Sequence, residues 1–113
     1  MYISVTLLKL TNPLKIGAFV KFAFAINQQI SKAEGVIKFK TGNKWLINNY
    51  TLSVWKSKQD MIKFISSGAH KEAMKVSKQI ASGLFSYGYE AVEMPNYKEE
   101  IDNIFRLSKG QKI

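Results

Sequence analysis

Strand-like and helix-like hydrophobic patterns alternate along this chain in an order that few folds share. Runs of β-branched residues or two-residue alternation predict strands, whereas apolar residues spaced three and four apart predict amphipathic helices. The predicted strands are 2–10, 36–41, 45–55 and 85–94, and the predicted helices are 12–32, 57–65, 69–82 and 96–109. Residues 66–68 interrupt the second crossover, so the order is β-α-β-β-α-β followed by one further helix.

That order is typical of the ferredoxin-like α+β arrangement, which is built on a four-stranded antiparallel sheet. Right-handed crossovers place both main helices on one face of the sheet. The other face carries leucine and valine side chains and has no cover within the chain, so the same face of a second copy would cover it at least cost. Since 113 residues is the length of one ordinary domain, we expect residues 1–113 to form a single domain that pairs as a homodimer through its sheet faces.

The residue types exclude several classes of chemistry. The chain has no cysteine and one histidine, which excludes disulfides, thiol nucleophiles and thiolate-bound metals, and we predict no metal site. The most apolar run, residues 16–26, contains Lys21 and is shorter than the ~20 residues that a membrane span needs. The first residues lack the basic flank of a signal peptide, so we expect a cytoplasmic protein.

A motif between residues 51 and 70 resembles a known family. It is a strand that ends in an aromatic residue, then a short helix, a break and a histidine: Thr51-Leu52-Ser53-Val54-Trp55-Lys56-Ser57, Met61, Phe64 and Ser67-Gly68-Ala69-His70. This pattern resembles the dimeric α/β-barrel superfamily, which includes the antibiotic biosynthesis monooxygenases, and is closest to its spheroidene-monooxygenase-like branch. The resemblance implies a homodimeric α/β barrel with an apolar pocket between each sheet and its helices.

The same resemblance implies an oxidoreductase that acts on a hydrophobic or aromatic small molecule, either with haem or with no cofactor. The alternative is a non-catalytic small-molecule or haem-binding protein of the same fold.

The single histidine, His70, is the candidate catalytic residue. It lies on the inner stripe of predicted helix 69–82 with Met74, a candidate substrate contact, and with the small residues Ala73 and Ser77. Small neighbours leave room for a ligand beside the imidazole, which could bind haem iron or act as a base near neutral pH. The alternative is a histidine packed in the core with one ring N–H bonded to a carbonyl group.

The other candidate substrate-binding residues are Trp55, Asn49, Thr51, Ser53 and Phe64. Asn49, Thr51 and Ser53 share one face of their predicted strand with Trp55, and polar side chains on an inward face need hydrogen-bond partners from protein, water or ligand. Trp55 lies at the strand end, where it either fills the core or lines the pocket and stacks on a flat ligand. Phe64 lies on the inner side of the short helix that follows.

The net charge of +9 raises a second alternative, a nucleic-acid partner. Lys38, Lys40 and Lys44 lie around the predicted hairpin beside Trp45, where they could contact phosphates. An RNA-recognition module of this topology needs a Lys/Arg-Gly-aromatic-Gly/Ala-aromatic pattern on its third strand, which residues 46–52 lack. We therefore disfavour nucleic acid and interpret the lysines mainly as solubilising residues.

Overall fold

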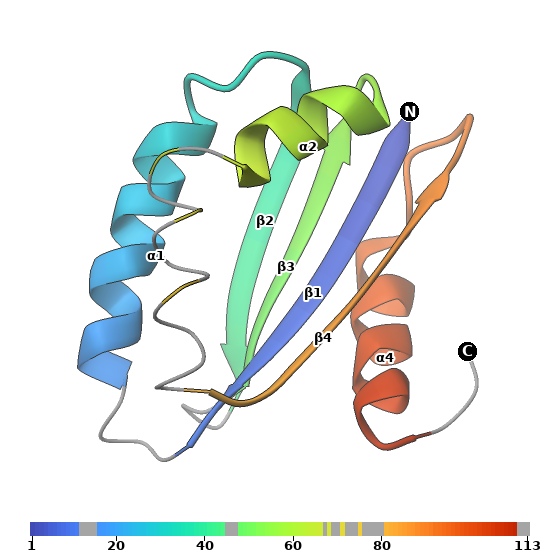
Figure 1. Ribbon diagram of the computed structural model, residues 1–113. Coiled ribbons are helices and arrows are strands. Elements are labelled where there is room, and N and C mark those ends of the chain that lie inside the picture. The colour runs from blue at the N-terminus through green and yellow to red at the C-terminus, as the bar shows by residue number, and fades with distance from the viewer. Residues whose placement is uncertain are drawn as a thin grey trace.

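A four-stranded sheet forms the centre of the molecule (Figure 1). The structure, a computed structural model, describes residues 1–11, 16–44, 48–66, 68, 71, 75 and 81–110. Its elements are β1 (Tyr2–Leu10), α1 (Ile16–Ile30), β2 (Val36–Lys44), β3 (Asn48–Trp55), α2 (Lys58–Ile65), β4 (Ala81–Glu90) and α4 (Tyr97–Ser108). Neighbouring strands are antiparallel in the order β2-β3-β1-β4, which confirms the predicted ferredoxin-like α+β fold. Within these ranges, no helix is long and apolar enough to cross a membrane.

Strand β4 differs most from its predicted boundaries, 85–94. It begins at Ala81, which pairs with Leu10 of β1, and it ends at Glu90, which pairs with Tyr2, the first residue of β1. Both limits therefore follow from the length of the partner strand, which supplies the hydrogen bonds of the ladder. Ala81 and Ser82, which the sequence placed in helix 69–82, belong to β4 instead, because strand pairing outweighs the local helical spacing.

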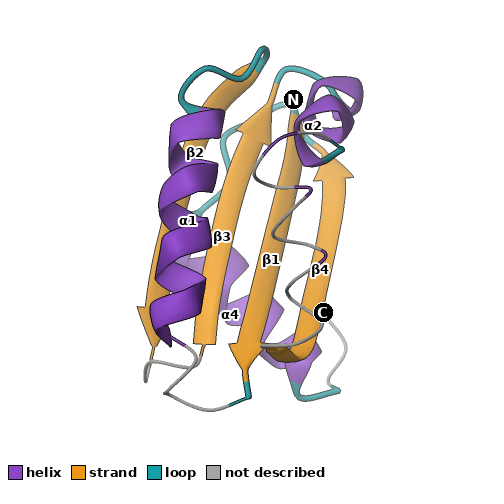
Figure 2. Cartoon of the chain, turned by 60° about the vertical axis from the view of Figure 1, so that its left-hand side comes forward, coloured by secondary structure: helices purple, strands orange, loops and turns teal. Residues whose placement is uncertain are grey.

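The two faces of the sheet meet different helices. Figure 2 shows α1 and α2 on one side of the sheet and α4 on the other. On the α4 side lies the main core, whose sheet residues are at most 2% exposed: Ile3, Val5, Leu7, Leu52 and Val54. Strand register places the alternate residues of β1 and β3 on the side of α1 and α2.

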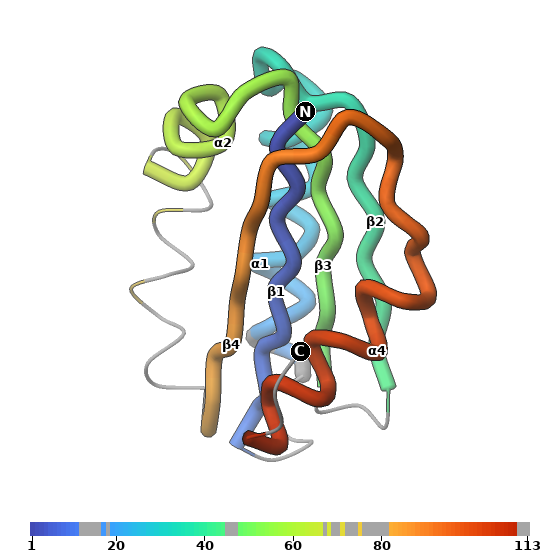
Figure 3. Tube along the Cα trace, turned by 90° about the vertical axis from the view of Figure 1, so that its right-hand side faces the viewer, coloured from blue at the N-terminus to red at the C-terminus, as the bar shows by residue number. Residues whose placement is uncertain are grey.

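The prediction of a bare sheet face is wrong, because α4 covers that face. Ile104 of α4 is fully buried in the main core and Ile101 is almost as buried, and Figure 3 shows α4 lying across this side of the sheet. The apolar stripe of α4 buries the same leucine and valine side chains for which a second copy was expected. The homodimer through sheet faces stays a prediction, but without the open face on which it was based.

A buried carboxylate also connects α4 to β4. Glu100 is 8% exposed and accepts hydrogen bonds from the hydroxyl groups of Tyr87 and Tyr89. Burial and the hydrogen bond to Glu100 raise the pKa of Tyr89 to about 12, and the same two causes raise the pKa of Tyr87. Both tyrosines are therefore held as neutral hydrogen-bond donors to this carboxylate.

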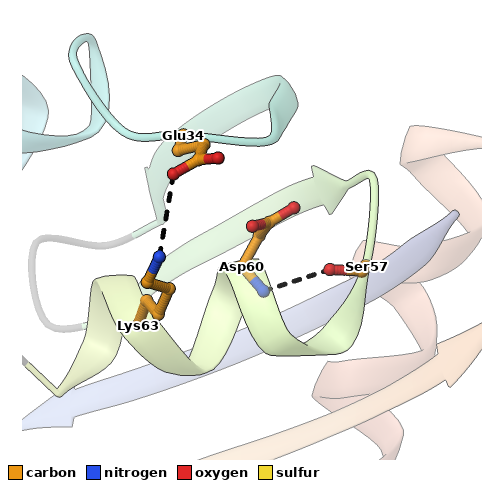
Figure 4. Close-up of polar contacts among 4 residues, drawn as sticks. All are labelled: Glu34, Ser57, Asp60 and Lys63. Atoms are coloured by element: carbon orange, nitrogen blue, oxygen red, sulfur yellow. Dashed lines mark hydrogen bonds and ion pairs between the residues drawn. The ribbon is translucent and has the colours of Figure 1, made fainter.

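Helix α2 begins at a side-chain cap. Ser57 Oγ accepts a hydrogen bond from the backbone N–H of Asp60 at 3.2 Å (Figure 4). The Lys63 ammonium lies 3.7 Å from the Glu34 carboxylate, but both side chains are mostly exposed, so this ion pair contributes little stability. Burial of Phe64 is the stronger force that holds α2 against the sheet.

Candidate ligand-binding site

A cavity of about 720 Å³ lies between the sheet and helices α1 and α2. This volume is within the range of small-molecule sites in proteins. Strands β1, β2, β3 and β4 form one wall, and α1 and α2 form the other. Six of the apolar side chains on the helical wall are Phe19, Phe22, Ala23, Ile26, Met61 and Phe64.

The helical wall follows from the sequence pattern of α1. Its apolar stripe, which includes Phe19, Phe22 and Ile26, faces the cavity, whereas Phe24 on the opposite side is 64% exposed. Both placements confirm the interpretation of α1 as an amphipathic helix. Val20 also borders the cavity but is largely exposed, so it lies at the rim.

The sheet wall is polar where the sequence predicts it to be. Asn49, Thr51, Ser53 and Trp55 all line the cavity, because alternate residues of β3 point to the same face. Phe64 of α2 lines it as well. The structure therefore brings five of the seven predicted site residues to one cavity, while their role in ligand binding stays a prediction.

Strand pairing extends this polar surface beyond β3. Thr51 pairs with Thr6 on one side and with Thr41 on the other, and Thr6 pairs with Ser86, so four hydroxyl residues cross the sheet in one row. Ser53 pairs with Ser4 in the next row. All six residues line the cavity. One wall of the cavity is thus rich in hydroxyl groups and the other is apolar.

The site residues predicted from the sequence include none from strand 2–10, so Ser4 and Thr6 were missed. A signal was present: positions 4 and 6 alternate with the fully buried Ile3, Val5 and Leu7. That alternation is the mark of a strand with one polar face. Thr41 and Ser86 could not be connected to it without the strand register.

Two buried N–H donors at this wall have no hydrogen-bond acceptor among the described residues, Asn49 Nδ2 and Trp55 Nε1. The Asn49 side chain is oriented by Asn43, whose Nδ2 donates to Asn49 Oδ1 at 2.6 Å. An unsatisfied buried donor costs about 1–3 kcal/mol. The two residues are six positions apart on one strand, roughly 20 Å, so they lie toward opposite ends of the cavity.

Trp55 both packs in the core and borders the cavity, which are the two placements that the sequence left open. It is 1% exposed and packs against Phe64, with the ring centroids 5.3 Å apart, in a small core cluster with Ile30. It also borders the cavity. The indole therefore fills the core at one end of the site, with its N–H buried and without an acceptor among the described residues.

The remaining predicted site residues, His70 and Met74, lie outside the described residues, as does Trp45. Haem iron takes histidine, cysteine, methionine or tyrosine ligands. The described part of the cavity wall contains Met61, Tyr2, Tyr50 and Tyr87 but no imidazole or thiolate. Haem ligation by His70 therefore stays a prediction. In the described ranges, no three His, Cys, Asp or Glu residues are grouped as a metal site would require.

No family model and no curated protein sequence matches this chain. Solved structures match its fold. A Nitrosomonas europaea protein named as a candidate antibiotic biosynthesis monooxygenase has a TM-score of 0.74 at 11% identity, over 82% of this chain and 100% of its own. A Deinococcus radiodurans protein of the same description has a TM-score of 0.73 at 17% identity, over 85% and 97%.

A third match is SnoaB, a cofactor-independent oxygenase from Streptomyces nogalater, with a TM-score of 0.62 at 8% identity, over 82% of this chain and 94% of SnoaB. At such low identity these matches show the fold alone. The chain has the α+β fold of the antibiotic biosynthesis monooxygenases, as the motif at residues 51–70 predicts.

Proposed function

We propose that this chain binds a hydrophobic or aromatic small molecule in the cavity and acts on it as a monooxygenase-like protein. The observation that carries the proposal is the asymmetry of the cavity. A mainly apolar helical wall suits the faces of an aromatic molecule, and the hydroxyl groups of the sheet wall can donate hydrogen bonds to oxygen or nitrogen acceptors on it. Asn49, Thr51, Ser53 and Trp55 would orient the ligand, while Phe64 and Met74 would contact its apolar part.

The fold supports oxygenation as the reaction at this proposed binding site. SnoaB is by name an oxygenase that needs no cofactor, and the same chemistry is our proposal for this chain. The alternative is a protein that binds the same class of molecule without transforming it. The spheroidene-monooxygenase-like branch and the homodimer belong to the proposal as well, as does a cytoplasmic location.

A substitution that fills the cavity tests the proposed site. We expect Ala23→Leu to weaken binding of a neutral apolar probe such as Nile red by about tenfold or more, since the larger side chain would occupy the space of the ligand. The measurement is a fluorescence titration. The matched control is Gln28→Leu, which adds the same side chain to the exposed side of α1 and should leave affinity within about twofold.

Equal affinity in both variants would remove the cavity as the binding site. Oxygen uptake with oxidisable aromatic compounds then separates the two functional alternatives: uptake that Ala23→Leu abolishes indicates an oxygenase, and binding without uptake indicates a non-catalytic protein.

The haem alternative has its own test. If His70 ligates haem iron, hemin titration should give a defined Soret band that His70→Ala loses or shifts, because the axial ligand sets the electronic spectrum of the iron. Lys71→Ala is the control, since it changes the next residue in the sequence without removing the imidazole or another possible haem ligand. An identical spectrum in His70→Ala would exclude His70 as the ligand.

A further inference from the structure

A second hollow, of about 530 Å³, lies on the opposite side of the sheet, where β1 and β2 end beside the last turns of α4. Its lining residues are Lys9, Lys44, Asn48, Asp102, Phe105, Arg106 and Lys109. We refer to it as the basic hollow. Its four cationic side chains and one carboxylate leave a net formal charge of +3.

Aromatic rings hold two of these cations near the protein surface. Lys9 Nζ lies 5.7 Å from the centroid of the Phe85 ring, and Lys44 Nζ lies 5.1 Å from the centroid of the Phe105 ring. Each contact contributes about 0.5–1 kcal/mol at an exposed site. The two ring contacts hold the Lys9 and Lys44 ammonium groups in place before a ligand binds, which lowers the entropy cost of binding an anion.

The carboxylate of the hollow does not neutralise these cations by direct contact. Across the described residues, Asp102 forms no ion pair within 4.0 Å with Lys9, Lys44, Arg106 or Lys109. Cations near the end of a helix are favoured by its dipole, which accounts for Arg106 and Lys109. It does not account for Lys9 and Lys44, which come from the ends of two strands.

We propose that the basic hollow binds the phosphate or diphosphate group of a small molecule. The Arg106 guanidinium can donate two parallel hydrogen bonds to phosphate oxygens, and the lysines supply point charges. Asn48, 8% exposed at the wall of the hollow, offers an amide donor. This site is separate from the proposed aromatic-ligand cavity, which lies across the sheet.

The geometry favours a compact anion over a nucleic-acid strand. The cations converge from three elements on one hollow whose volume suits a small molecule. A bound strand would need cations spaced along a track. Lys40, the next lysine along β2, does not line the hollow.

Calorimetric titration with inorganic pyrophosphate at about 100 mM salt tests this proposal. We expect saturable binding with one site per chain, weakened about tenfold or more in the double variant Arg106→Gln/Lys109→Gln. The matched control is Lys21→Gln/Lys32→Gln, which removes the same charge from exposed positions in and just after α1. It should change the affinity no more than about twofold. Lys9→Gln is a further variant, in β1 and over the Phe85 ring of β4, whose weakening would not depend on α4.

Absence of saturable binding, or equal weakening in both double variants, would overturn the proposal. So would binding of a single-stranded oligonucleotide that pyrophosphate does not displace. Vesicles containing phosphatidylglycerol distinguish the sources of the phosphate: capture on vesicles that pyrophosphate reverses assigns it to a lipid headgroup, and pyrophosphate binding alone assigns it to a soluble compound.

Discussion

Ile104→Ala should lower the free energy of unfolding by about 2–5 kcal/mol. Ile104 projects from α4 into the main core and is fully buried against the two central strands. Removing three carbon atoms there loses their burial and leaves a space that the rigid sheet can fill only in part. Urea unfolding followed by circular dichroism measures the effect.

Val92→Ala is the control for this prediction. Val92 is 97% exposed, so a comparable truncation should change the free energy of unfolding by less than about 0.5 kcal/mol. A similarly small effect of Ile104→Ala would mean that α4 is not docked on the sheet in solution. The apolar face would then be open to a second copy, and the homodimer expected from the sequence would regain its physical basis.

The placement of α4 shows where sequence reasoning reaches its limit. Local spacing shows that α4 has an apolar stripe, formed by Ile101, Ile104 and Phe105. The helix begins at a side-chain cap, where Asn96 Oδ1 accepts a 3.0 Å hydrogen bond from the Glu99 N–H. Spacing shows that a helix has an apolar face but does not show which surface it covers. The interpretation therefore left the sheet face open, although the chain itself contained the helix that covers it.

The cavity shows the same division between local and long-range information. The inward polar residues of β3 are readable from two-residue alternation within one strand. The hydroxyl row that includes Thr6 and Ser86 depends on register between strands that are distant in sequence, and register follows from the whole pattern of burial. That the Trp55 N–H has no acceptor among the described residues is harder still to predict, because it depends on the positions of all the polar atoms around the indole.

Glu100→Gln should destabilise the protein by about 1–3 kcal/mol at neutral pH. Glu100 accepts hydrogen bonds from Tyr87 and Tyr89 in a nearly dry position. A glutamine side chain offers one carbonyl oxygen to two donors, and its amide group brings two further donors. Glu93→Gln, the same change at an exposed position, should have almost no effect.

The same cluster sets a limit on stability at alkaline pH. The pKa of Tyr89 is about 12 in the folded protein against an ordinary value of 10.0, so between these pH values the unfolded chain has lost protons that the folded chain still holds. The free energy of unfolding therefore falls as pH rises through this interval, and this contribution is fully present only below pH 10.

Because the negative charge of Glu100 is one cause of the raised pKa, Glu100→Gln should move the Tyr89 titration toward lower pH. Nuclear magnetic resonance of ring-labelled tyrosine, assigned with Tyr89→Phe, measures each titration. A Tyr89 midpoint that is unchanged in Glu100→Gln would show that the carboxylate and the phenol do not interact in solution, and that contact would no longer explain how α4 is held to β4.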